Sequence, residues 1–97
     1  MEVSSSSTEH LRVAVHAPAG AAPEDNPVLI AFLPEGQDNP AGLWNEASWD
    51  VGRTTRHAQV LIGPGGVELG PGTYRVRVRV TEGIETPVMD AGELVVT

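Results

Sequence analysis

The stretch "TYRVRVRVTE", residues 73–82, decides the fold because its polar and apolar residues alternate. A period of two is typical of a β-strand with one face on a core and the other on solvent. Tyr74 and the three valines that follow it at alternate positions are therefore expected to point inward. The outward residues are Arg75, Arg77 and Arg79, which we call the arginine row. Half of the six basic residues of the chain stand in this row.

Other segments also have strand patterns. "HLRVAVH" (10–16) and "RHAQVLIG" (56–63) alternate, and "AGELVVT" (91–97) has Leu and Val at alternate positions. "VLIAFL" (28–33) is a continuous apolar run, typical of a central strand covered on both faces or of the centre of a sheet. A further short strand is expected around Trp49. Because Pro and Gly separate these segments and no window has a helical period, we predict an all-β fold: an immunoglobulin-like antiparallel β-sandwich of six to seven short strands.

Tyr74 is the only tyrosine, and its position supports the sandwich. Immunoglobulin-like domains place a tyrosine near the start of the penultimate strand, where its hydroxyl bonds to the backbone a few residues upstream. In "LGPGTYRVRV" (69–78) a turn leads into a strand whose second residue is this tyrosine. The spacing from Leu69 is one residue shorter than in fibronectin-like domains, so the sequence leaves the existence of the corner open.

The arginine row allows two interpretations. Its side chains stand about 7 Å apart and repel one another unless acids lie opposite. The next strand brings Asp90 and Glu93, and a hairpin that turns near Ile84 puts Glu93 opposite Arg75. The ordinary interpretation is cross-strand ion pairing on a solvated face, at a few tenths of a kcal/mol per pair. The alternative is a docking face for an acidic partner or another copy of this chain, because guanidinium groups form forked contacts with carboxylates.

Size and charge restrict the partners of the chain. Its 97 residues make one domain, it has no cysteine for disulfides or thiolate metal sites, and its formal charge is −7. Nucleic acids and anionic membranes need a basic footprint, so neither is an expected partner. The polar start lacks the features of a secretory signal, and no apolar run approaches the ~20 residues of a membrane span.

We expect residues 1–8 to form an N-terminal arm and residues 9–97 to form the sandwich domain. The arm contains a run of four serines: Ser4, Ser5, Ser6 and Ser7. Such a run is ordinarily a loose tail. The arm is therefore expected to be flexible or to gain order against a partner chain.

We find no pattern of a catalytic, cofactor or metal site, and expect none of the three. "GPGGVELGPG" (63–72) lacks the Gly-Lys-Ser/Thr ending of a phosphate loop, so a connecting turn is favoured. The histidines lack metal-ligand spacing, and the loop acids lack the calcium-loop pattern. These residues are His10, His16, His57, Glu24, Asp25, Asp38 and Asp50. The sequence therefore predicts a protein that is not an enzyme.

Trp44 and Trp49 are five residues apart and point to opposite faces if the segment is extended. Trp49 is expected to be the core aromatic residue of the sandwich. Trp44 follows a loop, and two alternatives stay open for it. It is either an exposed anchor for a protein partner or a sugar ring, or it packs against the edge of the sandwich.

Five motifs within residues 28–97 carry a resemblance: "AFLPEG", "WNEASWD", "VLIGPGG", "LGPGTYRVRVRVT" and "AGELVVT". Together they resemble a group of small structural proteins from tailed bacteriophages of actinobacteria. The resemblance implies an immunoglobulin-like virion component that is encoded among capsid and head–tail connector genes. It carries over no functional residue.

We therefore expect a non-enzymatic bacteriophage virion protein for capsid decoration, the minor capsid or the head–tail connector region. It would be assembled in the host cytoplasm and would adhere in many copies to major capsid or connector subunits. The expected contact residues are the four serines, Trp44 and the arginine row. The alternative function is a carbohydrate- or surface-binding module that uses Trp44 and the loop acids around Asp38 and Asp50.

Overall fold

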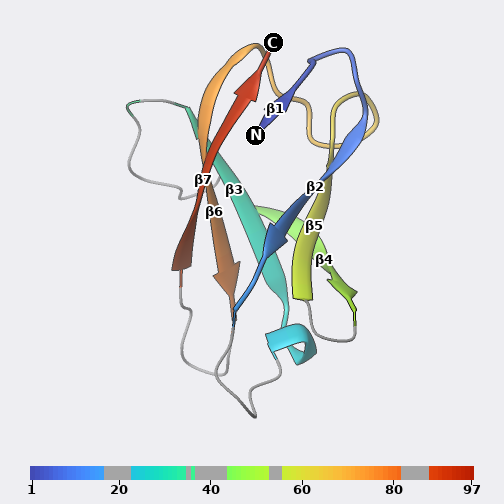
Figure 1. Cartoon of the computed structure of the whole chain (residues 1–97), viewed down its shortest axis with the longest axis vertical. Coiled ribbons are helices and arrows are strands. Elements are labelled where there is room, and N and C mark those ends of the chain that lie inside the picture. Colours follow the sequence, from blue (N-terminus) through green and yellow to red (C-terminus); the bar gives the residue numbers. More distant parts are fainter. Residues whose placement is uncertain (17–22, 35, 37–43, 53–55, 82–87) are drawn as a thin grey trace.

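A computed structural model of the chain describes residues 1–16, 23–34, 36, 44–52, 56–81 and 88–97. In these residues the fold is all β, with seven strands and one short 3₁₀ helix (Figure 1). The strands are β1 (Glu2–Val3), β2 (Glu9–Ala14), β3 (Val28–Pro34), β4 (Trp44–Val51), β5 (Arg56–Ile62), β6 (Gly72–Val80) and β7 (Val88–Val96), and the 3₁₀ helix η1 is Pro23–Asp25.

The strands follow one another in the order β1-β7-β6-β3-β4-β5-β2, in a nearly closed sheet of two layers. β4 belongs to both layers, because residues 44–47 pair with β3 and residues 48–51 pair with β5. The orders β7-β6-β3 and β2-β5-β4 are those of the two sheets of an immunoglobulin-like domain. The predicted β-sandwich is confirmed, with one difference. β1 runs parallel to β7, so the sheet is mixed and not purely antiparallel.

An aliphatic core fills the space between the two layers. The alternate residues that were expected to point inward are buried there: Leu11, Val15, Ala58, Val60, Ile62, Val76, Val78, Val80, Leu94 and Val96. Val13 and Tyr74 are half-buried and pack against this cluster. β3 adds Val28, Ile30 and Phe32. None of the described residues with a polar or charged side chain is fully buried, so burial of apolar groups is the main source of stability.

Tyr74 forms the tyrosine corner whose existence the sequence left open. Its hydroxyl donates a 2.8 Å hydrogen bond to the carbonyl oxygen of Gly70, four residues upstream. The bond joins the start of β6 to the connection that precedes it. The short spacing from Leu69 therefore does not prevent the corner.

Residues 1–8 are part of the sandwich, which corrects the expectation of a loose or partner-ordered arm. β1 pairs with β7, where the Thr97 N–H donates to the Val3 carbonyl oxygen at 2.9 Å. Val3 is buried in the core cluster. The Ser5 N–H then donates to the Thr97 carbonyl oxygen at 2.8 Å. Backbone hydrogen bonds to residues 95–97 and the burial of Val3 thus fix the start of this segment on the same chain.

The serine run crosses from β1 to β2, and a glycine makes room for it. Gly63 follows β5 with φ +105°, and a Cβ at this position would lie 2.0 Å from the Ser7 carbonyl oxygen. The Thr8 hydroxyl donates to the Pro64 carbonyl oxygen at 2.9 Å. The crossover therefore lies directly on the connection between β5 and β6.

Candidate interaction surface

The arginine row lies on the outer face of the β4-β3-β6-β7 layer. Its cross-strand neighbours on β3 are Leu33, Ala31 and Leu29, and Trp44 on β4 is the next neighbour of Ala31. Directly paired residues share one face of a sheet. These residues therefore form one continuous surface, which we call the arginine–tryptophan face. The name covers Leu29, Ala31, Leu33, Trp44, Arg75, Arg77 and Arg79, and the acids Glu46, Asp90 and Glu93 stand beside them on the same face.

Two apolar residues of this face are buried outside the core cluster. Ala31 and Leu33 are 0% exposed, yet neither belongs to the cluster between the layers. Arg77 stands beside Ala31, and Arg75 beside Leu33. An arginine can lay its aliphatic stem over apolar surface while its charged head reaches water. The interpretation of "VLIAFL" as a strand covered on both faces or at a sheet centre therefore agrees with the structure, in which β3 lies inside the sheet and arginines stand beside its outer residues.

Trp44 is half-buried, and the guanidinium of Arg79 lies over its ring. The Cζ of Arg79 is 4.6 Å from the ring centroid, a cation–π contact worth about 0.5–1 kcal/mol at an exposed site. Trp44 begins β4 and Arg79 lies near the end of β6, with β3 between them. Trp44 therefore packs on the sandwich through Arg79 and is still partly exposed. Arg79 occupies one face of the ring on which a sugar could have stacked.

Arg75 is the ion-paired member of the row. Its Nη1 lies 3.6 Å from Oδ2 of Asp90, and the two side chains are 52% and 53% exposed. The predicted register is confirmed, because Glu93 stands opposite Arg75. Arg75 nevertheless forms its ion pair with Asp90, which stands opposite Arg77 and therefore lies diagonally across from Arg75. An exposed pair of this kind contributes about 0.2–1 kcal/mol, and salt weakens it.

A β-bulge in β7 brings Asp90 and Glu93 to the same face. The register shifts between Arg75 and Arg77, so β7 has one extra residue there. Gly92 lies in the bulge with φ +96°, and its N–H donates to Oδ1 of Asp90 at 3.0 Å. Without the extra residue, two acids three positions apart would point to opposite faces. An isolated glycine inside a strand pattern was the signal in the sequence.

Arg77 differs from its neighbour Arg75 because none of the described carboxylates forms an ion pair with it. Its Nε atom is buried without a hydrogen-bond partner, and the same holds for Nε of Arg79. A buried donor without an acceptor costs about 1–3 kcal/mol. Within the described part of the chain, the Nε atoms of Arg77 and Arg79 thus have no hydrogen-bond acceptor.

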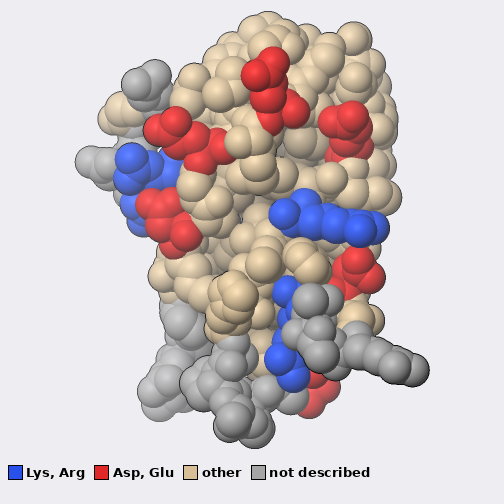
Figure 2. Space-filling model, viewed as in Figure 1, with Lys and Arg blue, Asp and Glu red and all other residues tan. Residues whose placement is uncertain are grey.

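The other ion pairs lie on different parts of the sandwich. Nη1 of Arg12 is 3.5 Å from Oδ2 of Asp50, across the β2-β5-β4 layer. Figure 2 shows one side of the molecule, on which basic side chains lie next to acidic ones and not in a patch of one sign. Charge alone therefore does not mark a site on this side.

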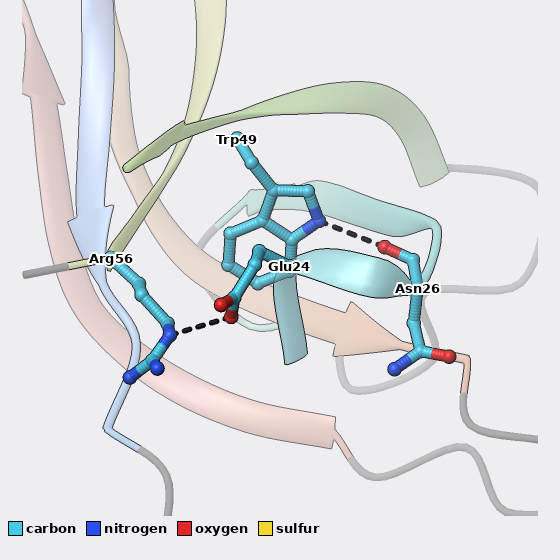
Figure 3. A network of polar contacts seen from close by, with 4 residues as sticks. All are labelled: Glu24, Asn26, Trp49 and Arg56. Atoms are coloured by element: carbon cyan, nitrogen blue, oxygen red, sulfur yellow. Dashed lines mark hydrogen bonds and ion pairs between the residues drawn. The ribbon is translucent and has the colours of Figure 1, made fainter. Parts of the chain in front are cut away.

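Trp49 has the predicted structural role. It packs against the core, and its Nε1–H donates to the carbonyl oxygen of Asn26 at 2.8 Å. Arg56 of β5 forms an ion pair with Glu24 of η1 (Figure 3). These two contacts hold η1 against the end of the layers, so Glu24 is a structural residue.

The remaining candidate residues from the sequence do not come together. In the described parts of the chain, no group of three or more His, Asp and Glu residues is placed to hold a metal ion. Asp38 lies outside the described residues. The serine run is in the crossover, where the hydroxyls of Ser4 and Ser6 are 2.9 Å apart and bond to each other. The structure therefore unites Trp44 with the arginine row but leaves the serines in a separate segment.

Compared with known proteins, the chain matches no family model, no curated protein and no solved structure. Among the described residues, no helix has the length and apolar character that crossing a bilayer requires. The roles of individual residues in this chain are therefore inferred from the geometry of its own structure.

Proposed function

We propose that the chain is a non-enzymatic adhesion protein of a bacteriophage virion, which binds a neighbouring protein subunit through the arginine–tryptophan face. The observation that carries the proposal is the state of Arg77. Arg77 stands opposite the buried Ala31, its guanidinium has no ion pair among the described residues, and its Nε is buried without a hydrogen-bond acceptor there. Because Nε is enclosed, carboxylates of a partner would bind the terminal nitrogens of this half-buried side chain in charge-assisted bonds.

The neighbours of Arg77 support a protein partner in particular. Tryptophan and arginine are the residues most often found at the energetic centre of protein interfaces. Trp44 and Arg79 are already held in place by their mutual contact, so little side-chain entropy is lost when a partner binds. The expected partner surface is acidic and belongs to a major capsid or connector subunit.

The virion part of the proposal rests on the sequence resemblance. A decoration or connector subunit repeats the same contact in many copies, so weak individual contacts add up to firm attachment. One small sandwich with one docking face is sufficient for such a role.

Mass spectrometry of gradient-purified phage particles tests the location. The expected result is that this chain is present at a fixed number of copies per particle, and that number distinguishes a shell from a neck component. Recovery of the chain only in the unassembled fraction of the lysate would contradict the virion role.

Two matched substitutions test the docking face. Arg77→Gln removes the unpaired guanidinium, whereas Arg12→Gln removes an exposed arginine from the other layer. We expect Arg77→Gln to lower incorporation into particles by about tenfold or more, since loss of a buried charged contact costs about 2–5 kcal/mol. Arg12→Gln should leave incorporation unchanged. If Arg77→Gln were incorporated as well as Arg12→Gln, the arginine–tryptophan face would not be the docking face.

A further inference from the structure

A groove of about 180 Å³ lies between β2 and β7, on the side where the nearly closed sheet stays open (Figure 1). Its apolar lining consists of Val13, Ala14, Val15, Val78, Met89 and Ala91, and His16 and Asp90 complete it. Figure 2 looks onto this side, and most of the surface between the two strands is uncharged. The groove therefore offers an apolar floor between two strands.

β2 is an open edge of the sheet. Among the described residues it pairs with β5 alone, and its six residues include neither proline nor a bulge. The Val15 N–H donates to the Arg56 carbonyl oxygen at 2.9 Å, on the β5 side. Because the direction of N–H and C=O groups alternates along a strand, those of Arg12 and Ala14 point away from β5. These backbone groups are free to bond to another strand.

The β7 edge of the same groove is less suited to such pairing. The bulge at Gly92 interrupts its ladder, and the Asp90 carboxylate already accepts the Gly92 N–H. Bulges are one of the devices by which proteins prevent unwanted strand addition. β2 carries the exposed charges of Glu9 and Arg12 but has no bulge, so its ladder is uninterrupted.

We propose that β2 accepts an extended segment of another protein as an additional strand. Strand addition combines main-chain hydrogen bonds with pockets for alternate side chains. The lining of the groove selects apolar residues at every second position of the segment. Asp90 lines the groove and the chain carries a charge of −7. The residues of the bound segment that alternate with the apolar ones should therefore be basic. This proposal does not depend on the virion role and uses a different surface.

A synthetic peptide provides the first test. The acetylated peptide TYRVRVRV, a copy of residues 73–80, has the required alternation of apolar and basic residues. At 0.15 M salt we expect it to bind the full chain and to shift backbone amide NMR signals of residues 10–14. A version N-methylated at alternate residues lacks the edge donors and should bind at least tenfold more weakly. A scrambled peptide, RRRVVVTY, has the same charge and should be weakened equally.

A pair of substitutions provides the second test. Ala14→Pro removes an N–H that points away from β5 and leaves the β2–β5 ladder intact, whereas Ala14→Thr keeps this N–H. We expect Ala14→Pro to weaken peptide binding at least tenfold and Ala14→Thr to change it less than twofold, with circular dichroism as the check of folding. If Ala14→Pro does not fold, the N-methylated peptide decides.

Three results would overturn the proposal. They are no binding of the TYRVRVRV peptide, equal binding of the N-methylated or scrambled peptide, and NMR shifts confined to β7 or to the arginine–tryptophan face.

Discussion

The two faces of β3 are both buried, but different groups cover them. Ile30 and Phe32 on the inner face pack against aliphatic side chains of the other layer. Ala31 and Leu33 on the outer face are just as inaccessible, yet they lie beside arginines. The comparison shows that burial alone does not identify a core. The aliphatic side chains against the inner face are enclosed in the core. The arginines beside the outer face carry guanidinium groups that a partner can bind.

Ile30→Ala is the substitution with the largest expected effect. Ile30 is fully buried between the layers, where the surrounding side chains cannot collapse into the space left behind. We expect a loss of about 4 kcal/mol in the free energy of unfolding, measured by urea denaturation. A loss below about 2 kcal/mol would mean that the inner face is not tightly packed.

Leu33→Ala tests the outer face directly. Leu33 is as inaccessible as Ile30, but its cross-strand neighbour is Arg75, whose stem can move into the new space. The expected loss is about 2 kcal/mol, at the low end for a leucine truncation. A loss equal to that of Ile30→Ala would remove the distinction between the two faces.

Arg79→Met and Arg79→Ser separate the stem from the charge. Methionine keeps an apolar cover over the sheet and loses only the contact with the Trp44 ring. We expect thermal unfolding to show a loss of about 0.5–1 kcal/mol for methionine and about 1 kcal/mol more for serine. A serine variant as stable as the methionine variant would show that the arginine stem covers nothing.

Arg75→Gln should have the smallest effect. It removes an ion pair with Asp90 in which both partners are half exposed. The expected loss is at most about 0.5 kcal/mol and should be smaller still in 1 M NaCl. A loss above about 1 kcal/mol at either salt concentration would mean that this pair is a structural part of the outer cover.

Local patterns predicted the parts of the fold that depend on local geometry. The alternation of Ala58, Val60 and Ile62 identified the inward side of β5, because side chains along a strand change faces at every residue. The apolar run of β3 predicted burial on both faces. Tyr74 and Trp49 were found because their residue types have few positions in a sandwich.

The candidate site was only half predictable. Alternation placed the arginine row outward, but nothing in the local sequence indicates that Arg79 reaches Trp44 across β3. The serine run was interpreted as a tail because its partners, Thr97 and Gly63, lie at distant positions of the chain. Such contacts join residues that are far apart in the sequence and form only when the strands assemble. No local sequence pattern therefore predicts them.

The parallel pairing of β1 with β7 determines how the domain responds to pulling. Tension between residues 1 and 97 would act along both strands in opposite directions, across the bonds from Val95 N–H to the Met1 carbonyl and from Thr97 N–H to the Val3 carbonyl. In this shear geometry the bonds must break together and not one after another. The two-residue strand is thus a mechanical clamp, and it protects the rest of the sandwich until it ruptures.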